Sequence, residues 1–264
     1  MNEAMVLVEV DGPIGTLTLN RPDRLNSFVG EMRDEIGAGL VELGGREDVR
    51  VVVVTGAGRA FCAGADVRYL AELLERGDIE EASLLVAAGG TVVRTIRSMP
   101  KPVIASLNGP AAGGGANLAL ACDLRIASDR ATIGQTFNRI GLHPDWGGSY
   151  LLPRLVGPAR AAELVFLADM IDAQEAERIG LFNRVVPHDT LGAVTRETAE
   201  RLAVKPALAL RLAKESLVAS LSSSLEEMLA RELKAQRACF ESADALEGVR
   251  SFVEKRPARF GQDT

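Results

Sequence analysis

Apolar and polar residues follow two different patterns along the chain, and the change falls near residue 158. Before it, short apolar runs predict strands separated by helices. Two of these runs flank the turn sequence DGP in VLVEVDGPIGTLTLN, which predicts a β-hairpin. Apolar residues at helical spacing over residues 28–43 then predict a helix that stops at a pair of glycines.

The middle of the chain repeats one pattern, in which a buried strand leads into a glycine-rich loop and then into a helix. The β-branched run VRVVVVTG, residues 49–56, is followed by GAGRAFCAGAD and a helix from about Val67. The run KPVIASLNG, residues 101–109, is followed by PAAGGGAN and a helix from about Ala116. DLRIAS and ATIGQT predict two further strands. The recurrence indicates a wound core built of similar turns.

From residue 158 onward the pattern is helical. Prolines separate the predicted helices, which are ARAAELVFLA, AQEAERIG, ETAERLAV, PALALRLAKESLVAS, LEEMLARELKAQRACFES and ALEGVRSFVEK. The chain has 264 residues, 47% of them hydrophobic, which suffices for one sizeable core with a helical extension. The sequence therefore predicts a mixed α/β core followed by a helical C-terminal region.

Charge and cysteine content narrow the function classes. The net charge is -6 and no dense block of lysine and arginine is present, so neither nucleic acid nor an anionic membrane is an expected partner. Three scattered cysteines form no disulfide framework and are typical of a reducing compartment. The first residues do not resemble a signal peptide, no apolar run could span a bilayer, and no His/Cys/Glu spacing indicates a metal site. We expect a cytoplasmic protein without a metal.

The two glycine-rich loops have three competing uses. A dinucleotide fold needs G-x-G-x-x-G, but Phe61 and Leu118 stand at the third glycine position of the two loops. A phosphate-binding P-loop needs Lys-Ser/Thr after its last glycine, and neither loop has it. The third use is an oxyanion hole, in which two backbone N–H groups near helix starts stabilise one developing negative charge. Two matched loops favour this use over close helix packing alone.

Successive segments of the chain resemble the enoyl-CoA hydratase/isomerase (crotonase) superfamily. The resemblance covers nearly the whole chain and rests on LTLNRPDRLNSF, VVVVTGAGRAFCAGADV, KPVIASLNGPAAGGGANLALACDLRIAS, IGLHPDWGGSYLLPRLVG, AERIGLFNRVVP and SFVEKRPARF. It implies an α/β fold, a crotonase-like spiral of β-β-α turns, with residues 1–195 as the acyl-CoA-binding core. Residues 196–264 would form a helical trimerisation region, giving a homotrimer or a dimer of trimers. The substrate would be an acyl-CoA thioester, with no further cofactor.

The resemblance also assigns positions in the site. The two donors of the oxyanion hole fall on Ala65 and Gly114, which would hold a thioester enolate. The remaining positions expected to contact substrate or coenzyme A are Arg24, Ala63, Gly64, Asp66, Arg68, Gly113, Asn117, Phe137, Trp146, Phe252 and Lys255. Among them, Asp66 is interpreted as the cap of the helix that begins near Val67.

Two of these positions disfavour hydration. Hydratases of the family carry one Glu at the position of Asn117 and a second at the position of Phe137, and use the pair to activate water and deliver a proton. An amide neither gains nor loses a proton at neutral pH, and a phenyl ring has no proton to give. Water addition therefore lacks both its acid and its base.

A carboxylate follows a few residues later, in GLHPDWGG. Asp145 lies where several isomerases of the family carry their catalytic aspartate. One carboxylate can remove a proton, hold it while the enolate is stabilised, and return it elsewhere. GLHPDWGGSYLLPRLVG looks most like the ring-epoxyphenylacetyl-CoA isomerase branch, which also handles Δ3/Δ2-enoyl isomerisation. An acyl-CoA isomerase is the predicted activity.

Other side chains near these motifs have ordinary interpretations. Cys62 is expected to be a small buried thiol, and His143 a loop residue that could line the pocket. Trp146, the only Trp, packs against an aromatic acyl group or fills the core. GGSYL departs from the G-x-S-x-G nucleophile pattern at Leu151, so a serine hydrolase is not supported.

Three alternatives to the isomerase stay open. An enoyl-CoA hydratase could use Asp145 with a water held by Asn117. A dehalogenase or hydrolase would need Asp145 to attack the acyl group covalently. A family member without catalysis could bind acyl-CoA, or serve as an RNA-binding or scaffold subunit, although the acidic balance argues against RNA.

Overall fold

A computed structural model describes residues 4–261, and its core is a six-stranded sheet in the order β1-β2-β3-β4-β6-β9. β1 pairs with β2 in an antiparallel hairpin, and the other neighbours pair in parallel. The strands are β1 (Val6–Asp11), β2 (Ile14–Leu19), β3 (Val51–Gly56), β4 (Val103–Leu107), β6 (Leu124–Ser128) and β9 (Arg184–Val186). Because β3 and β4 lie in the interior of the sheet, their near-continuous apolar runs are buried on both faces.

A second, three-stranded sheet has the order β5-β7-β8. It consists of β5 (Ala111–Ala112), β7 (Thr132–Gly134) and β8 (Met170–Asp172). A parallel bridge between Cys62 and Ala111, and another between Phe28 and Ala65, connect the glycine-rich loops to this layer. The chain thus repeats a turn in which a strand of the large sheet leads into a short second strand and a helix, as the spiral of β-β-α turns requires.

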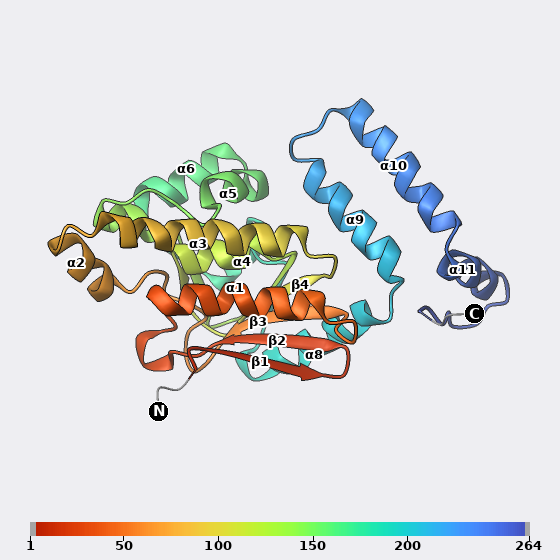
Figure 1. Ribbon diagram of the computed structural model, residues 1–264, viewed down its shortest axis with the longest axis horizontal. Helices are drawn as coiled ribbons and strands as arrows, with labels where there is room; N and C mark the ends of the chain where they lie inside the picture. Colours follow the sequence, from red (N-terminus) through yellow and green to blue (C-terminus); the bar gives the residue numbers. More distant parts are fainter. Residues whose placement is uncertain (1–3, 262–264) are drawn as a thin grey trace.

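Helices cover both faces of the large sheet (Figure 1). Val52 and Val54 belong to the apolar core beneath α1 and α3, whereas Val51 and Val53 pack with the residues of α8 on the opposite face. The helices of the core are α1 (Gly30–Gly45), α2 (Val67–Glu75), α3 (Ile79–Ser98), α4 (Gly114–Ala121), α5 (Gly148–Val156), α6 (Pro158–Leu167), α7 (Ala173–Arg178) and α8 (Leu191–Ala203). Short 3-10 turns are η1 (Pro22–Arg24), η2 (Thr136–Ile140) and η3 (His188–Thr190).

Most predicted elements are present with shifted ends. The N-terminal hairpin, the two central strands and the two strands after them are confirmed. The helix expected over residues 28–43 spans Gly30–Gly45, and the helix expected from Ala116 begins at Gly114, two residues earlier. Nothing in the sequence pattern predicted α3, α5, β5, β8 or β9. α5 was missed because Pro153 lies inside it, at a position where its ring does not interrupt the helix.

Three helices extend away from the sheet: α9 (Ala207–Ala219), α10 (Leu225–Phe240) and α11 (Ala243–Val253). Figure 1 shows α9 and α10 side by side, with α11 at the end of the molecule opposite α2. One ion pair, 2.7 Å between Lys214 Nζ and Asp123 Oδ2, joins α9 to the core. The division predicted between residues 195 and 196 lies within α8, which packs on the sheet.

No helix of the described residues is both long and apolar enough to cross a membrane.

Candidate active site

The two glycine-rich loops, two helices and the segment before α5 enclose a cavity of about 260 Å³. Its wall is apolar except for Ser83, Thr136 and Asp145, and Asp145 is the one ionisable side chain among the lining residues. The lining residues are Phe28, Ala63, Gly64, Ala65, Val67, Leu70, Leu74, Ala82, Ser83, Leu85, Val86, Gly113, Gly114, Thr136, Phe137, Ile140, Leu142, Asp145 and Trp146. An apolar cavity with few polar groups is the usual form of a small-molecule site.

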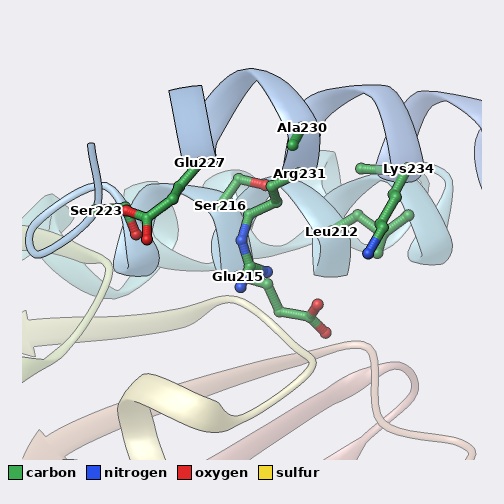
Figure 2. Close-up of a pocket in the computed structure, with 9 residues that line it drawn as sticks. Leu212, Glu215, Ser216, Ser223, Glu227, Ala230, Arg231 and Lys234 are labelled. Atoms are coloured by element: carbon green, nitrogen blue, oxygen red, sulfur yellow. The ribbon is translucent and has the colours of Figure 1, made fainter. Parts of the chain in front are cut away.

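A larger hollow lies elsewhere, between α9 and α10 (Figure 2). It is lined by side chains such as Glu215, Arg231 and Lys234, and none of its lining residues belongs to the glycine-rich loops. Within residues 4–261 no group of His, Cys, Asp and Glu side chains is arranged to hold a metal ion. Of these two hollows, the cavity with Asp145 is the one that the glycine-rich loops line.

The backbone N–H groups of two residues that line the cavity, Ala65 and Gly114, are candidate donors. Phe28 N donates to the Gly64 carbonyl at 2.7 Å and Asp66 N donates to the Phe28 carbonyl at 2.9 Å, so the N–H of Ala65, between them, is directed away from this bridge. Among the described residues, neither the N–H of Ala65 nor that of Gly114 has a hydrogen-bond acceptor. Free donors of this kind can hold an oxygen that becomes negative during a reaction.

Each glycine of the GGG run has its own reason. Gly113 caps α4 with φ 52° and ψ -123°, a backbone conformation that L side chains rarely adopt. Gly114 supplies the free N–H at the start of α4, where the helix dipole favours negative charge. A Cβ on Gly115 would overlap the Cys62 carbonyl oxygen, so only glycine allows α4 to lie against the first loop. Gly64 has φ 85°, and a Cβ on it would lie only 2.7 Å from the Ala112 carbonyl oxygen, so glycine is required here as well.

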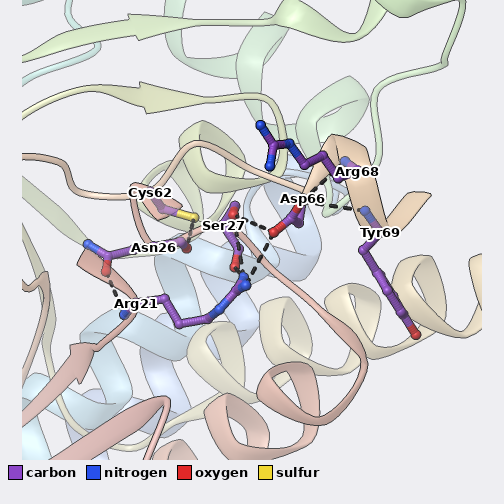
Figure 3. A network of polar contacts seen from close by, with 7 residues as sticks. All are labelled: Arg21, Asn26, Ser27, Cys62, Asp66, Arg68 and Tyr69. Carbon is purple, nitrogen blue, oxygen red and sulfur yellow. Dashed lines mark hydrogen bonds and ion pairs between the residues drawn. The ribbon is translucent and has the colours of Figure 1, made fainter. Parts of the chain in front are cut away.

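The first donor is positioned by a polar network that follows it in the chain (Figure 3). The Asp66 carboxylate accepts hydrogen bonds from the N–H groups of Arg68 at 3.1 Å and Tyr69 at 3.4 Å, which confirms that it caps α2. Arg21 forms an ion pair with Asp66 at 3.2 Å. Burial acts to raise the pKa of Asp66, but these hydrogen bonds and the guanidinium hold that pKa below its ordinary value. Asp66 is thus an anionic cap and does not line the cavity.

Asp145 is in a different environment. Burial among apolar side chains raises its pKa to about 6, against smaller opposing effects of a backbone hydrogen bond and of His143. Its Oδ1 atom is buried and has no hydrogen-bond partner among the described residues. A Cβ placed on Gly114 would be 3.7 Å from this oxygen, so base and donor lie within reach of one bound group. A carboxyl group with a pKa close to neutrality can both accept and return a proton.

The residues after Asp145 form the aromatic wall of the cavity. Trp146 is buried and stacks on Phe28, with ring centroids 4.3 Å apart and planes 3° from parallel. Trp146 has φ 45°, in the left-handed region, which costs roughly 1–2 kcal/mol for an L residue. The stack compensates part of this cost. Gly89 in α3 has no Cβ that would overlap the Trp146 indole, so this glycine makes room for the ring.

Asn117 and Phe137 have different positions relative to the cavity. Phe137 lines it, beside Gly113. Asn117 does not, contrary to the expectation that it contacts substrate. It is fully buried behind the wall, where its Nδ2 donates to the Asp145 carbonyl at 2.9 Å and its Oδ1 accepts from Gln135 at 2.8 Å.

The predicted coenzyme A residues separate into two groups. Ala63 lines the cavity, and Arg24 on η1 and Arg68 on α2 are exposed close to the loops that form it. Phe252, 86% exposed, and the exposed Lys255 belong to the C-terminal end of the chain. Figure 1 places α11 at the end of the molecule opposite α2, so the structure does not bring these two residues to the cavity of their own chain.

Two ordinary interpretations are supported by the geometry. Cys62 is buried, and burial raises the pKa of its thiol to about 12, as expected for a packing residue and not for a nucleophile. His143 is exposed and lies in an adjacent hollow beside Phe166 and not in the cavity wall.

Sequence reasoning missed several residues of the site. Asn26 is fully buried, and its Nδ2 donates to the carbonyls of Ala57 and Ala60 at 2.9 and 2.8 Å, which fixes the first loop. Gln135 was missed because its role depends on Asn117, 18 positions away. The helix after Val67 and the segment from Leu70 to Met99 were expected to shape the pocket, but the individual side chains, such as Leu70 and Leu74, could not be assigned from the sequence.

A cavity with two candidate backbone donors and one carboxylate, on a spiral of β-β-α turns, has the composition of a site that can stabilise an oxyanion. The family model described as enoyl-CoA hydratase/isomerase matches residues 9–263. The chain belongs to the enoyl-CoA hydratase/isomerase family, and its fold is the crotonase fold.

Relatives and solved structures agree with this assignment. The 1,2-epoxyphenylacetyl-CoA isomerase of Escherichia coli (strain K12) is 38% identical over 256 residues, 97% of each chain. The crotonyl-CoA hydratase of Syntrophomonas wolfei is 37% identical, again over 97% of each chain. The crystal structure of an enoyl-CoA hydratase from Bacillus anthracis superposes with a TM-score of 0.93 at 35% identity, covering 98% of this chain and 100% of that one. Both activities are thus found among relatives of similar identity.

Gly89→Ala tests the packing of the Trp146 indole against α3. Replacing glycine by alanine in a helix usually stabilises it by up to about 1 kcal/mol. Here the added methyl would meet the indole, so we expect a loss of about 1–3 kcal/mol of unfolding free energy. Urea unfolding followed by the fluorescence of the single Trp measures both the stability and the environment of the ring. Gly90→Ala, at the next position of α3, is the control and should keep the wild-type spectrum; equal behaviour of the two variants would contradict the packing.

Asp145→Asn tests the burial of the carboxylate. The folded protein holds the Asp145 proton up to about pH 6, whereas the unfolded chain releases it near the ordinary value of 3.8, so wild-type stability falls as pH rises through this window. The variant lacks this loss and should be more stable at pH 7.5 by as much as about 3 kcal/mol, with no gain at pH 3.5. Thermal or urea unfolding at the two pH values measures the difference in stability between the variant and the wild type. Asp23→Asn, on the exposed η1, is the control. An equal effect at both pH values would show that Asp145 is not desolvated.

Proposed function

We propose that the protein is an acyl-CoA isomerase that moves a double bond, or rearranges a ring, in a CoA thioester. The observation that carries the proposal is the composition of the cavity wall, in which Asp145 is the one ionisable side chain and lies beside the free N–H of Gly114. The positions where family hydratases carry two glutamates are Asn117 and Phe137. One carboxylate suffices for a proton shuttle between two carbons of the same substrate.

The proposed reaction consumes no water. The Asp145 carboxylate removes a proton from C2 of a 3-enoyl thioester, and the electron pair moves onto the thioester oxygen to give a dienolate. The N–H groups of Ala65 and Gly114 stabilise this oxyanion, an effect worth on the order of 10²–10³ in rate for each donor in comparable sites. Protonated Asp145 then returns the proton at C4, which regenerates the carboxylate and gives the 2-enoyl thioester.

The acyl group is proposed to be apolar, and aromatic groups fit the wall. Stacked Phe28 and Trp146, with Phe137, present flat rings to the cavity. The relative named 1,2-epoxyphenylacetyl-CoA isomerase supports ring-modified thioesters as a substrate class. Arg24 and Arg68 are the proposed contacts of the CoA phosphates, because both are exposed beside the loops.

Enoyl-CoA hydratase is the second candidate, because several relatives carry that name. Hydration would require Asp145 alone to activate water and to supply the proton, since neither Asn117 nor Phe137 can take part. The two candidates differ in the product.

The first experiment supplies purified protein with 3-enoyl-CoA and 2-enoyl-CoA separately and follows product mass and conjugation. We expect migration of the double bond at unchanged mass, with kcat lost as pH falls through about 6 because Asp145 must be ionised to act as base. Asp145→Asn should reduce kcat at least about 10²-fold while the CoA ester still binds. A gain of one water as the main reaction, or full turnover by the variant, would contradict the isomerase.

The oligomer is proposed to be a homotrimer or a dimer of trimers built through the C-terminal helices. Leu225, Leu229, Leu233 and Phe240 form an exposed apolar stripe on α10, and α11 adds exposed Val249, Phe252 and Val253. Apolar patches of this kind mark contact surfaces. In such an assembly Phe252 and Lys255, remote from the cavity of their own chain, would contact the CoA of a neighbouring one.

Leu233→Glu tests the oligomer. A charge in the centre of the stripe, where Leu233 is 74% exposed in the single chain, should dissociate the assembly or weaken it strongly. Sedimentation or light scattering measures the molar mass, which we expect to be three or six times 28.1 kDa for the wild type. Lys234→Ala, at a side chain that lines the hollow between α9 and α10 and does not belong to the stripe, should leave the mass unchanged. A wild-type monomer at micromolar concentration would contradict the proposal.

A further inference from the structure

We propose that Asn117 and Gln135 are positioning residues, which hold the Asp145 backbone through a buried pair of amides and so fix the carboxylate relative to the oxyanion donors. The inference deepens the proposed isomerase and rests on it for the role of Asp145. Asn117 contacts neither the cavity nor the reacting group, so it acts only through Asp145.

The hydrogen bonds of the pair run in one direction. The Asp145 carbonyl oxygen can only accept, so Asn117 must present its NH₂ group to it, at 2.9 Å. The Oδ1 atom of Asn117 then faces Gln135 and requires a donor, which is the Gln135 NH₂ group at 2.8 Å. The same carbonyl accepts a second bond, from Gly148 N at 2.8 Å. Two donors from different elements therefore fix the plane of the peptide that links Asp145 to Trp146.

The packing leaves Asn117 no freedom to turn. It is fully buried, and Gln135 is 2% exposed. A Cβ on Gly148 would collide with the Asn117 amide, so α5 can begin at this place only because a glycine stands there. The residue that follows this peptide, Trp146, has a left-handed backbone with φ 45°.

Asn117 lies in the same helix as one oxyanion donor. α4 begins at Gly114, whose N–H is free, and Asn117 follows one turn later. A single rigid helix thus carries both the donor for the thioester oxygen and the group that fixes the base. Displacement of a catalytic group by about 1 Å can cost about 10²-fold in rate. Because α4 connects the two groups directly, it can fix the distance between the Asp145 carboxylate and the Gly114 N–H.

The amide pair is suited to positioning and not to proton transfer. Neither amide titrates near neutrality. The titratable group that faces Asp145 is His143, on the same segment. The cavity residues that face Asp145 from the 63–65 loop, α2, α3, α4 and η2 are all uncharged. A change in the behaviour of Asp145 on replacement of Asn117 therefore reports a change of its position or solvation.

The test compares Asn117→Ala, Gln135→Ala and the double variant. For Asn117→Ala we expect kcat for double-bond migration to fall on the order of 10²-fold with KM unchanged, because binding of the thioester does not involve the amide. Gln135→Ala should lower kcat less, and the double variant should match Asn117→Ala, since Gln135 acts only through Asn117. Asn138→Ala is the matched control, because its exposed amide also donates to a backbone carbonyl, that of Val165 at 2.9 Å.

A second measurement does not depend on turnover. The titration of Asp145, followed by ¹³C NMR of labelled aspartate and assigned with Asp145→Asn, should move toward lower pH in Asn117→Ala as water reaches the loosened loop. If the wild type fails to isomerise but this shift occurs, the proposed function is wrong and the positioning role stands. An unchanged titration, an unchanged kcat in an active enzyme, or additive losses in the double variant would overturn the inference.

Discussion

The close approach of α4 to the first glycine-rich loop is the contact on which the site depends. Gly115 lies where a Cβ would overlap the Cys62 carbonyl oxygen, and a Cβ on Gly64 would crowd the Ala112 carbonyl oxygen. This approach places Ala65 and Gly114, the residues with the two candidate donors, in the wall of one cavity. The cost of several glycines in and beside a helix, roughly 0.5–1 kcal/mol each, is explained by the two donors that they bring together.

A second constraint concerns the segment that carries Asp145. Its carboxylate is half-buried, the buried Oδ1 has no partner among the described residues, and the next residue has a left-handed backbone. Both features are unfavourable for folding, and both are held by packing: the Phe28 ring on Trp146, the absent side chain of Gly89, and the amide of Asn117. Strain and desolvation at one place are typical of sites where a group must be kept ready to react.

Much of the fold follows from the sequence, because strands with β-branched runs and glycine loops have strong local signals. The hairpin, β3, β4 and the start of α2 at the Asp66 cap are examples. Asp145 was found through its resemblance to family isomerases, not through a local pattern. The place of Asn117 could not be predicted, since whether its amide faces the cavity or the Asp145 carbonyl depends on how α4 meets α5. The distance of Phe252 and Lys255 from the cavity also depends on the path of α9 to α11 outside the core.

The central claim is that one carboxylate moves a proton between two carbons of a bound thioester. The most direct measurement uses a 3-enoyl-CoA labelled with deuterium at C2 and locates the label in the product by mass spectrometry and NMR. Because Asp145 is the one ionisable side chain in an apolar cavity wall, the account predicts that part of the label appears at C4 of the 2-enoyl product. A product that has gained a water molecule, with no label at C4, would contradict it.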